Sequence, residues 1–253
     1  MPQLMRTSNP ALRGDTFRTG EATFGDSMTI SGAVNKTGIL LICCVATAAW
    51  TWNRFFNAGS PEVAMQAVAP MMVVGGIGGF ILAMVTIFKK EWSPVTAPIY
   101  ALLEGLLLGG VSAMLEMRFH GIAIQAVALT FGTLVAMLVA YRTGLIKVTD
   151  KLRLGIVAAT GGIAVFYLLQ FVLGFFGVHF TTINGSSPIG IGFSLLVVVI
   201  AALNLVLDFD LIENGARMGA PKYMEWYGAF ALMITLIWLY FEILRLLSKF
   251  RQR

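Results

Sequence analysis

The stretch Ile200–Gly215 reads IAALNLVLDFDLIENG and closes a run of more than fifteen apolar and small residues with two aspartates, Asp208 and Asp210. A run of this length is long enough to enter a bilayer as a helix. An ionisable residue inside such a helix is by default the hypothesis of a functional site, because burial of its charge in lipid is costly. Asp208 therefore needs a functional explanation.

Helix stability does not provide that explanation. The stretch ends at Asn214 and Gly215, a pair that is typical of a helix C-terminus. Asp208 and Asp210 would then lie near the negative end of the helix dipole, where a carboxylate is unfavourable. The position of the two acids in the sequence indicates that they are present for another reason.

The two aspartates are predicted to face different surroundings. At about 3.6 residues per turn, Asn204 and Asp208 share one stripe of the helix, whereas Asp210 points about 200° away and lines up with Glu213 and Arg217. We expect Asp208 to be buried and paired with the amide of Asn204. We expect Asp210, Glu213 and Arg217 to form a solvated helix end, as surface charges usually do.

Composition places the chain in a membrane. Of its 253 residues, 57% are hydrophobic and 12% are charged, and the mean hydropathy is +0.80. In a soluble domain about a quarter of the residues are charged. The net charge of +5 does not indicate nucleic-acid binding, because the basic residues lie in short loops between apolar runs, as in the positive-inside pattern. The composition predicts an all-α, polytopic membrane protein.

Seven apolar segments predict a bundle of seven transmembrane helices over residues 34–253, after a polar, flexible arm over residues 1–33. The arm has no apolar core of the kind that a signal peptide needs. The segments are Thr37–Phe56, Val63–Phe88, Pro94–Met117, Ile122–Tyr141, Leu154–Val178, Ile189–Ile212 and Trp226–Leu247.

Loop charges predict the orientation. With the N-terminus inside, the inner loops and the chain before the first segment, through Lys36, hold twelve Lys and Arg residues, whereas the outer loops hold only Arg54 and Arg118. The N-terminus of this multi-pass protein is therefore predicted to be cytoplasmic, in the cell membrane. Seven full crossings place the basic C-terminal tail outside, against the rule. We expect the last segment to cross completely nonetheless.

Small residues recur at spacing four in two of the segments. They are Gly75 and Gly79 in the second, and Ala101, Gly105 and Gly109 in the third. Small residues on one face allow helix backbones to approach closely in lipid. The sequence therefore predicts tight packing of the second segment against the third.

Glu104 lies about ten residues, or roughly 15 Å, into the third segment, close to the middle of a hydrocarbon core about 30 Å thick. No Lys or Arg lies at a comparable depth in any segment. An unpaired carboxyl group there is expected to hold a proton at neutral pH, unless water or a cation reaches it. It is then either a neutral hydrogen-bonding group or a titrating group on an ion path.

Asp208 lies roughly 29 Å from the start of its segment, which predicts a gate position near the cytoplasmic face. On the last segment, Glu225 lies at the cytoplasmic edge, and Glu242 with Arg245 is expected to form an interfacial pair. Two carboxylates brought together would share a proton, and protonation or calcium would change their spacing.

The residues indicate no enzyme. No nucleophile is placed with a base, and neither a HExxH metal-binding pattern nor a phosphate-binding loop occurs. Cys43 and Cys44 are neighbours that face different directions on a helix, so neither a disulfide between them nor a metal site is expected. His120 and His179 are expected to be solvated loop residues. We expect no cofactor other than transiently bound calcium.

The chain resembles the transmembrane Bax inhibitor motif family, and in particular a bacterial subgroup that carries RTSNPAL near its start. Here that motif is Arg6–Leu12. Two further stretches carry the resemblance, LDFDLI at Leu207–Ile212 and ILRLL at Ile243–Leu247. The resemblance covers nearly all of the chain.

The resemblance implies a bundle with two three-helix layers around a central last helix. It also implies a pH-sensitive calcium leak that is controlled by an aspartate pair between the sixth and seventh helices. Asp208 matches the first of these aspartates, whereas Thr235 stands where the second is expected and cannot share a proton as a carboxylate does. The arginine of the second helix is also missing. A latch would then be built from Asp208 with Glu104 or Asp210.

Three functions remain open. The first is a pH-gated cation leak that uses Asp208 and Glu104, with calcium or protons as its ligands. The second is a non-transporting regulator that binds a membrane protein partner, such as a membrane protease, through its polar arm or its helix faces. The third is a proton-coupled transporter of a small solute, which would use the same acids.

Overall fold

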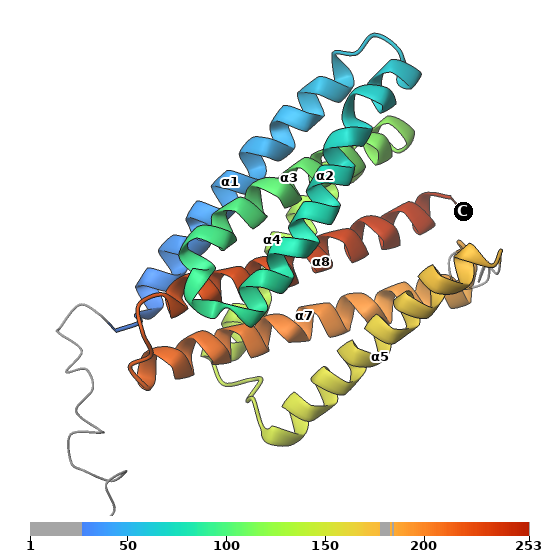
Figure 1. The fold of residues 1–253 in the computed structure, drawn as a ribbon. Coiled ribbons are helices and arrows are strands. Elements are labelled where there is room, and N and C mark those ends of the chain that lie inside the picture. Colours follow the sequence, from blue (N-terminus) through green and yellow to red (C-terminus); the bar gives the residue numbers. More distant parts are fainter. Residues whose placement is uncertain (1–26, 178–182, 184, 253) are drawn as a thin grey trace, which may run out of the picture.

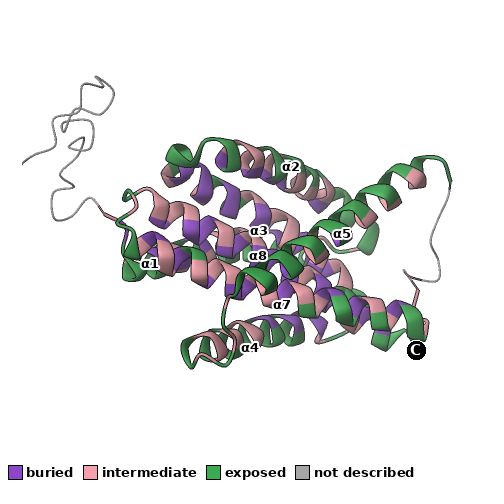
Figure 2. Cartoon of the chain, turned by 90° about the horizontal axis from the view of Figure 1, so that it is seen from below, coloured by how far each residue is buried: buried purple, intermediate pink, exposed green. Residues whose placement is uncertain are grey.

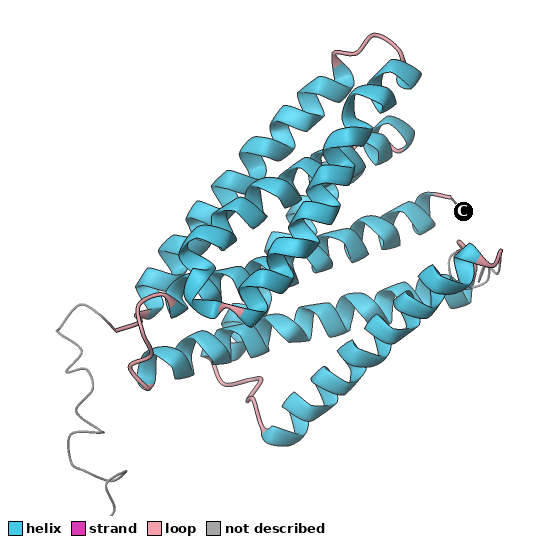
Figure 3. Cartoon of the chain, viewed as in Figure 1, coloured by secondary structure: helices cyan, strands magenta, loops and turns pink. Residues whose placement is uncertain are grey.

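The computed structural model describes residues 27–177, 183 and 185–252. Over these residues the chain folds into seven long helices without a β-strand, as Figures 1 and 3 show. Each is long and apolar enough to cross a membrane, so the predicted all-α, seven-helix membrane protein is confirmed. The helices are α1 (Ile30–Phe56), α2 (Pro61–Phe88), α3 (Ser93–Arg118), α4 (Ile122–Arg142), α5 (Asp150–Phe175), α7 (Pro188–Arg217) and α8 (Met224–Arg251), and the short 3-10 helix η2 (Lys90–Trp92) joins α2 to α3.

Several helices extend beyond the apolar segments. α1 begins at Ile30, because the side chain of Thr29 accepts a hydrogen bond from the backbone N–H of Gly32 and caps the helix. The predicted end of α7 at Asn214 and Gly215 is wrong, since the helix continues to Arg217. The residue that leaves the helix in a left-handed conformation is Gly219, with φ of 65°.

α8 is the central helix. It is the most buried of the seven and packs against α1, α3, α4 and α7. In Figure 2, where the chain is coloured by burial, α8 lies among the other helices. On one side of it α3 packs against α1 and α2, and on the other α7 packs against α4 and α5. The arrangement is the one that the family resemblance implies. α5 is the least buried helix, and its main neighbour is α7.

The loop charges predict that the end of the bundle at which α1 begins is cytoplasmic, and we call it the inner end. There Glu225 is completely buried at the start of α8 and forms ion pairs with Lys36 of α1 and with Lys222, the latter at 2.9 Å. The backbone N–H and the hydroxyl group of Thr29 each donate a hydrogen bond to the same carboxylate, at 2.8 Å. Glu225 therefore ties α1 to α8, and both of its carboxylate oxygens have structural partners.

Glycine packing confirms one half of the prediction for α2 and α3 and corrects the other. A Cβ atom at Gly75 would lie 2.5 Å from the carbonyl oxygen of Leu103, so α2 does pack backbone to backbone on α3. Gly105 faces α1 instead, where a Cβ atom would overlap the Thr47 hydroxyl group and the Cys44 carbonyl oxygen. Because α3 lies between α1 and α2, it packs closely on two of its faces, one against each helix.

Candidate functional site

Asp208 lies on α7 and faces α8. It is nine residues, or about 14 Å, from the inner end of the helix. This is deeper than the sequence predicts, because α7 continues past the expected cap. The Thr235 hydroxyl group on α8 is its hydrogen-bonding neighbour, while Oδ2 of the carboxyl group is buried without a hydrogen-bond partner among the described residues. An ionised carboxylate in such a place needs a proton, a cation or water to offset the cost of burial.

The predicted pairing of Asn204 with Asp208 is wrong. The amide nitrogen of Asn204 donates to the Thr160 hydroxyl group on α5, at 2.8 Å, and to the carbonyl oxygen of Ile200, at 2.9 Å. Helix periodicity correctly places Asn204 one turn from Asp208, but a stripe on one helix does not specify which neighbouring helix supplies the partner. The effect is that Asp208 remains unpaired on one oxygen.

Polar side chains follow the junction of α5, α7 and α8 from one end of the bundle to the other. Each polar contact joins two of these helices. On α7 alone the set extends from Asp210 to Ser194, sixteen residues or about 24 Å, which is most of a hydrocarbon core about 30 Å thick. We call this set the polar seam: Arg153, Thr160 and Tyr167 of α5, Ser194, Asn204, Asp208 and Asp210 of α7, and Thr235, Glu242, Arg245 and Lys249 of α8.

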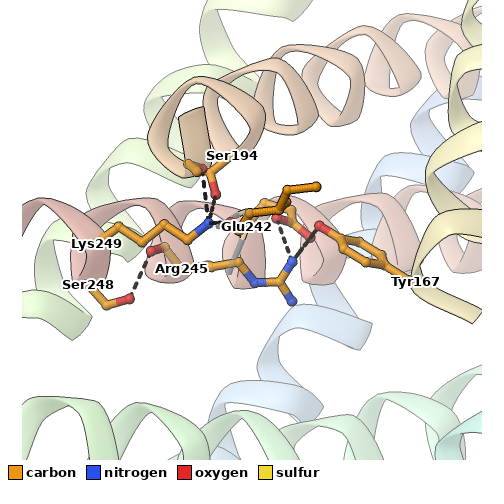
Figure 4. A network of polar contacts seen from close by, with 8 residues as sticks. Tyr167, Ser194, Glu242, Arg245, Ser248 and Lys249 are labelled. Carbon is orange, nitrogen blue, oxygen red and sulfur yellow. Dashed lines mark hydrogen bonds and ion pairs between the residues drawn. The ribbon is translucent and has the colours of Figure 1, made fainter. Parts of the chain in front are cut away.

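The outer half of the seam holds an ion pair between a buried glutamate and an exposed arginine. Glu242 is only 2% exposed, accepts a hydrogen bond from the Tyr167 hydroxyl group at 3.0 Å, and pairs with Arg245 at 3.2 Å. Figure 4 shows the three side chains together. Arg245 also donates to the oxygen of Tyr167 and lies over its ring. Glu242 pairs with Arg245 as predicted, and Tyr167 of α5 contacts both side chains. A cavity of about 450 Å³ reaches Glu242 and Arg245 from the outer side.

Lys249 belongs to the basic C-terminal stretch of the sequence, yet it lies within α8 and is almost completely buried, at 3% exposure. Its ammonium group donates to the Ser194 hydroxyl group at 2.9 Å and to the carbonyl oxygens of Gly190 at 3.0 Å and Ile183 at 2.7 Å. A lysine ammonium has three protons to donate. All three therefore have an oxygen partner, and the outer ends of α7 and α8 are held together (Figure 4).

Glu104 lies in a different part of the molecule. It is buried at 9% exposure on α3 and packs against α2, where a Cβ atom at Gly79 would lie 2.6 Å from Oε1. Cys44 of α1 and Tyr100 of α3 lie near its carboxyl group. Glu104 is thus surrounded by the helices of the α1–α3 layer and belongs to no part of the polar seam.

Asp210, Glu213 and Arg217 line a cavity of about 760 Å³ at the inner end. Asp210 forms an ion pair with Arg153 of α5 at 2.5 Å, and Glu213 pairs with Arg217 at 2.5 Å and accepts a hydrogen bond from Tyr141 of α4. The predicted helix end is therefore polar and accessible, but two of its three members are in contact with other helices.

Neither cavity is lined by Asp208, and Glu104 lines neither of them. The structure therefore does not bring Asp208 together with Glu104 or Asp210 into one carboxylate pair. It brings Asp208 together with Thr235, the position at which the resemblance expects the second aspartate. Sequence reasoning missed Lys249, Tyr167 and Thr160 as seam residues. Only the spacing of seven between Thr160 and Tyr167 on α5 could have indicated a shared polar face.

Among the residues that the structure describes, no group of three or more His, Cys, Asp or Glu side chains could hold a metal ion. Cys43 and Cys44 are free thiols. The backbone carbonyl of His120 accepts a hydrogen bond from Arg251, at 2.5 Å. His179 and the motif Arg6–Leu12 lie outside the described residues.

The family model described as Bax inhibitor 1 like matches residues 9–252. The match covers nearly the whole chain, including all seven helices. No curated protein matches the chain, and no solved structure matches it either.

Proposed function

We propose that this chain, which belongs to the Bax inhibitor 1 like family, is a pH-sensitive cation leak of the cell membrane in which Asp208 is the group that responds to protons. Calcium is the proposed cation, and the polar seam between α5 and the α7–α8 pair is the proposed path. The proposal requires no enzymatic chemistry and no cofactor.

The observation that carries this proposal is the buried, unpartnered oxygen of Asp208. Every other acid of the seam has a basic partner, Arg153 for Asp210 and Arg245 for Glu242. Asp208 has only the neutral Thr235 hydroxyl group on one side. A cation that moved along the seam would find one ligand there that no residue of the chain already neutralises. A proton would compete with the cation for the same oxygen.

The packing of α5 provides the means of opening the seam. Only two residues of α5, Ile156 and Ile163, are buried, and both lie on the stripe that also carries Thr160 and Tyr167. Little apolar area packs this helix against α7, so its polar contacts in the seam contribute much of what holds it there. A small displacement of α5 would therefore open the seam at Asn204, one turn from Asp208, without disturbing the α1–α3 layer.

Flux into liposomes tests this proposal. Purified protein is reconstituted into vesicles that contain a calcium-sensitive dye, and calcium entry is followed from about pH 5 to pH 8, a range in which buried carboxylic acids titrate. We expect a pH-dependent flux that Asp208→Asn makes independent of pH. The matched control is Asp150→Asn, which removes an exposed carboxylate in the first turn of α5 and should leave the pH profile unchanged.

Absence of flux above that of empty vesicles over the whole range would end the proposal. If the flux depends on pH equally in Asp208→Asn and in the unchanged protein, Asp208 is not the group that responds to protons. A proton flux that appears only with an added small solute would favour the proton-coupled transporter instead.

The second candidate is a non-transporting regulator of a membrane protein. The exposure of the α5 face that points away from the bundle favours it. This face exposes large apolar side chains along the whole helix, among them Leu154, Val165 and Phe171. A partner helix could pack there without displacing any contact of the bundle. Deletion of residues 1–26 or bulky substitutions on this face would then abolish the cellular phenotype, whereas Asp208→Asn would preserve it.

A further inference from the structure

Two cavities lie end to end in a groove between α1 and α4. The inner cavity, of about 760 Å³, is the one that Asp210 and Glu213 line, and the outer cavity has a volume of about 470 Å³. Leu41 of α1 lines both, and α8 forms the floor of both through Leu232 and Met233. Both volumes fall within the range of about 300–1,000 Å³ that is usual for ligand pockets. The groove therefore continues past Leu41 from the inner end into the outer half of the bundle.

The inner cavity has an unbalanced positive charge. Arg142 at the end of α4 and Lys147 in the following loop line it, together with three further charged residues, Asp210, Glu213 and Arg217. Asp210 and Glu213 are neutralised by Arg153 and Arg217. In the part of the chain that the structure describes, Arg142 and Lys147 have no ion-pair partner. Two exposed cations at the inner end thus remain available for an anion.

The outer cavity is almost entirely apolar. Val45 of α1 and Ile124, Val127 and Phe131 of α4 form its walls, and each of these side chains is exposed on the surface of the isolated bundle. In a bilayer this surface is surrounded by acyl chains. The groove therefore combines a cationic end at the predicted cytoplasmic surface with an apolar channel at the depth of the hydrocarbon core.

We propose that the groove between α1 and α4 binds an anionic glycerophospholipid of the cytoplasmic leaflet. Its phosphate headgroup lies at Arg142 and Lys147, and one acyl chain follows the groove past Leu41 into the outer cavity. Basic pockets between transmembrane helices on the cytoplasmic side are suited to anionic headgroups. An extended peptide would need partners for its backbone N–H and C=O groups, which the apolar walls of the outer cavity do not supply. The proposal does not depend on cation flux.

Native mass spectrometry of the full-length protein, released from detergent, tests the proposal. Phosphatidylglycerol and phosphatidylcholine with the same acyl chains are offered in turn, and retained lipid is counted. Because each basic residue near an anionic surface changes binding by about five-fold, we expect a preference of roughly 30-fold for phosphatidylglycerol. Arg142→Gln with Lys147→Gln should abolish this preference. The matched control Lys89→Gln with Lys90→Gln removes two exposed cations from the α2–α3 connection and should retain it.

The apolar half of the groove is tested separately. Ala49 is an exposed alanine that lines the outer cavity, whereas Ala46 is exposed on the same helix and lines neither cavity. Ala49→Trp should reduce retention of phosphatidylglycerol several-fold, and Ala46→Trp should not. Soluble glycerol phosphate, which has the headgroup without the chains, should not displace the lipid.

Four results would overturn the proposal: equal retention of the two lipids, an unchanged preference in the Arg142 and Lys147 variant, an unchanged retention in Ala49→Trp, and displacement by glycerol phosphate. The last would indicate a site for a free anion only. Elution of each variant at the volume of the unchanged protein serves as the folding control. Lys147→Gln alone, in an exposed loop, replaces the double variant if that variant does not fold, and should still reduce the preference about five-fold.

Discussion

The α1–α3 layer and the junction of α5, α7 and α8 each hold a carboxyl group in an apolar helix, yet they are built in opposite ways. Glu104 lies among glycine and alanine contacts, where helix backbones meet closely and the neighbouring side chains carry no charge. Asp208 lies in a file of hydroxyl, amide and charged groups that extends along three helices. The comparison teaches that an acid in a membrane helix is a stronger candidate for a functional site when a continuous file of polar side chains reaches it.

The difference in packing predicts the largest effect. Gly105→Ala introduces a Cβ atom that overlaps the backbone of α1 at Cys44, so we expect a loss of about 1–3 kcal/mol or more in stability. Gly161→Ala on α5 meets no atom within 4 Å and should be neutral or slightly stabilising, because alanine favours the helix. Thermal unfolding of both variants in detergent measures the contrast. Equal melting temperatures would show that the α1–α3 layer is no tighter than the seam.

Lys249→Met should have the next largest effect. The substitution keeps a long, unbranched side chain, one atom shorter, but leaves the oxygens of Ser194, Gly190 and Ile183 without their donor, at a cost of about 1–3 kcal/mol. Lys89→Met, at an exposed position, is the control and should leave the melting temperature unchanged. A Lys249 variant as stable as the control would mean that the outer end of the seam contributes nothing to the fold.

The smallest effect is expected at the inner end of the seam. Arg153 is about half exposed, so loss of its pair with Asp210 in Arg153→Gln should cost less than about 1 kcal/mol of stability. Hydrogen exchange is more sensitive here, and amides of α5 should exchange faster while those of α1 remain unchanged. Faster exchange spread evenly over both helices would contradict the view that α5 is a separately held element.

Sequence alone predicted most of the fold, for physical reasons that can be stated. Long apolar runs define helices that cross a membrane, and the run that contains Asp208 was among them. Helix ends were less accurate, because a polar residue such as Asn214 ends an apolar run without ending the helix. Lys249 shows the same limit, since a basic residue at the end of a span can be buried when carbonyl oxygens of a neighbouring helix meet it.

The candidate site was predicted only in part. Asp208 was identified because an ionisable residue within an apolar run can be recognised from the sequence alone, without knowledge of its neighbours in the fold. Its surroundings were not found, because Thr160, Tyr167 and Asn204 are ordinary residues in membrane helices until the packing of α5 on α7 brings them together. Asp208 and Glu104 are both carboxyl groups within apolar runs of the sequence. Only the tertiary structure shows that their neighbours differ.

Infrared difference spectra of the protein in liposomes test the central claim most directly, because they record which carboxyl groups gain or lose a proton. Between about pH 5 and pH 8, a range in which buried carboxylic acids titrate, we predict a carboxylic-acid band that disappears in Asp208→Asn and persists in Glu104→Gln. A band that persists in Asp208→Asn and disappears in Glu104→Gln would contradict the assignment of the proton-responsive group to the seam.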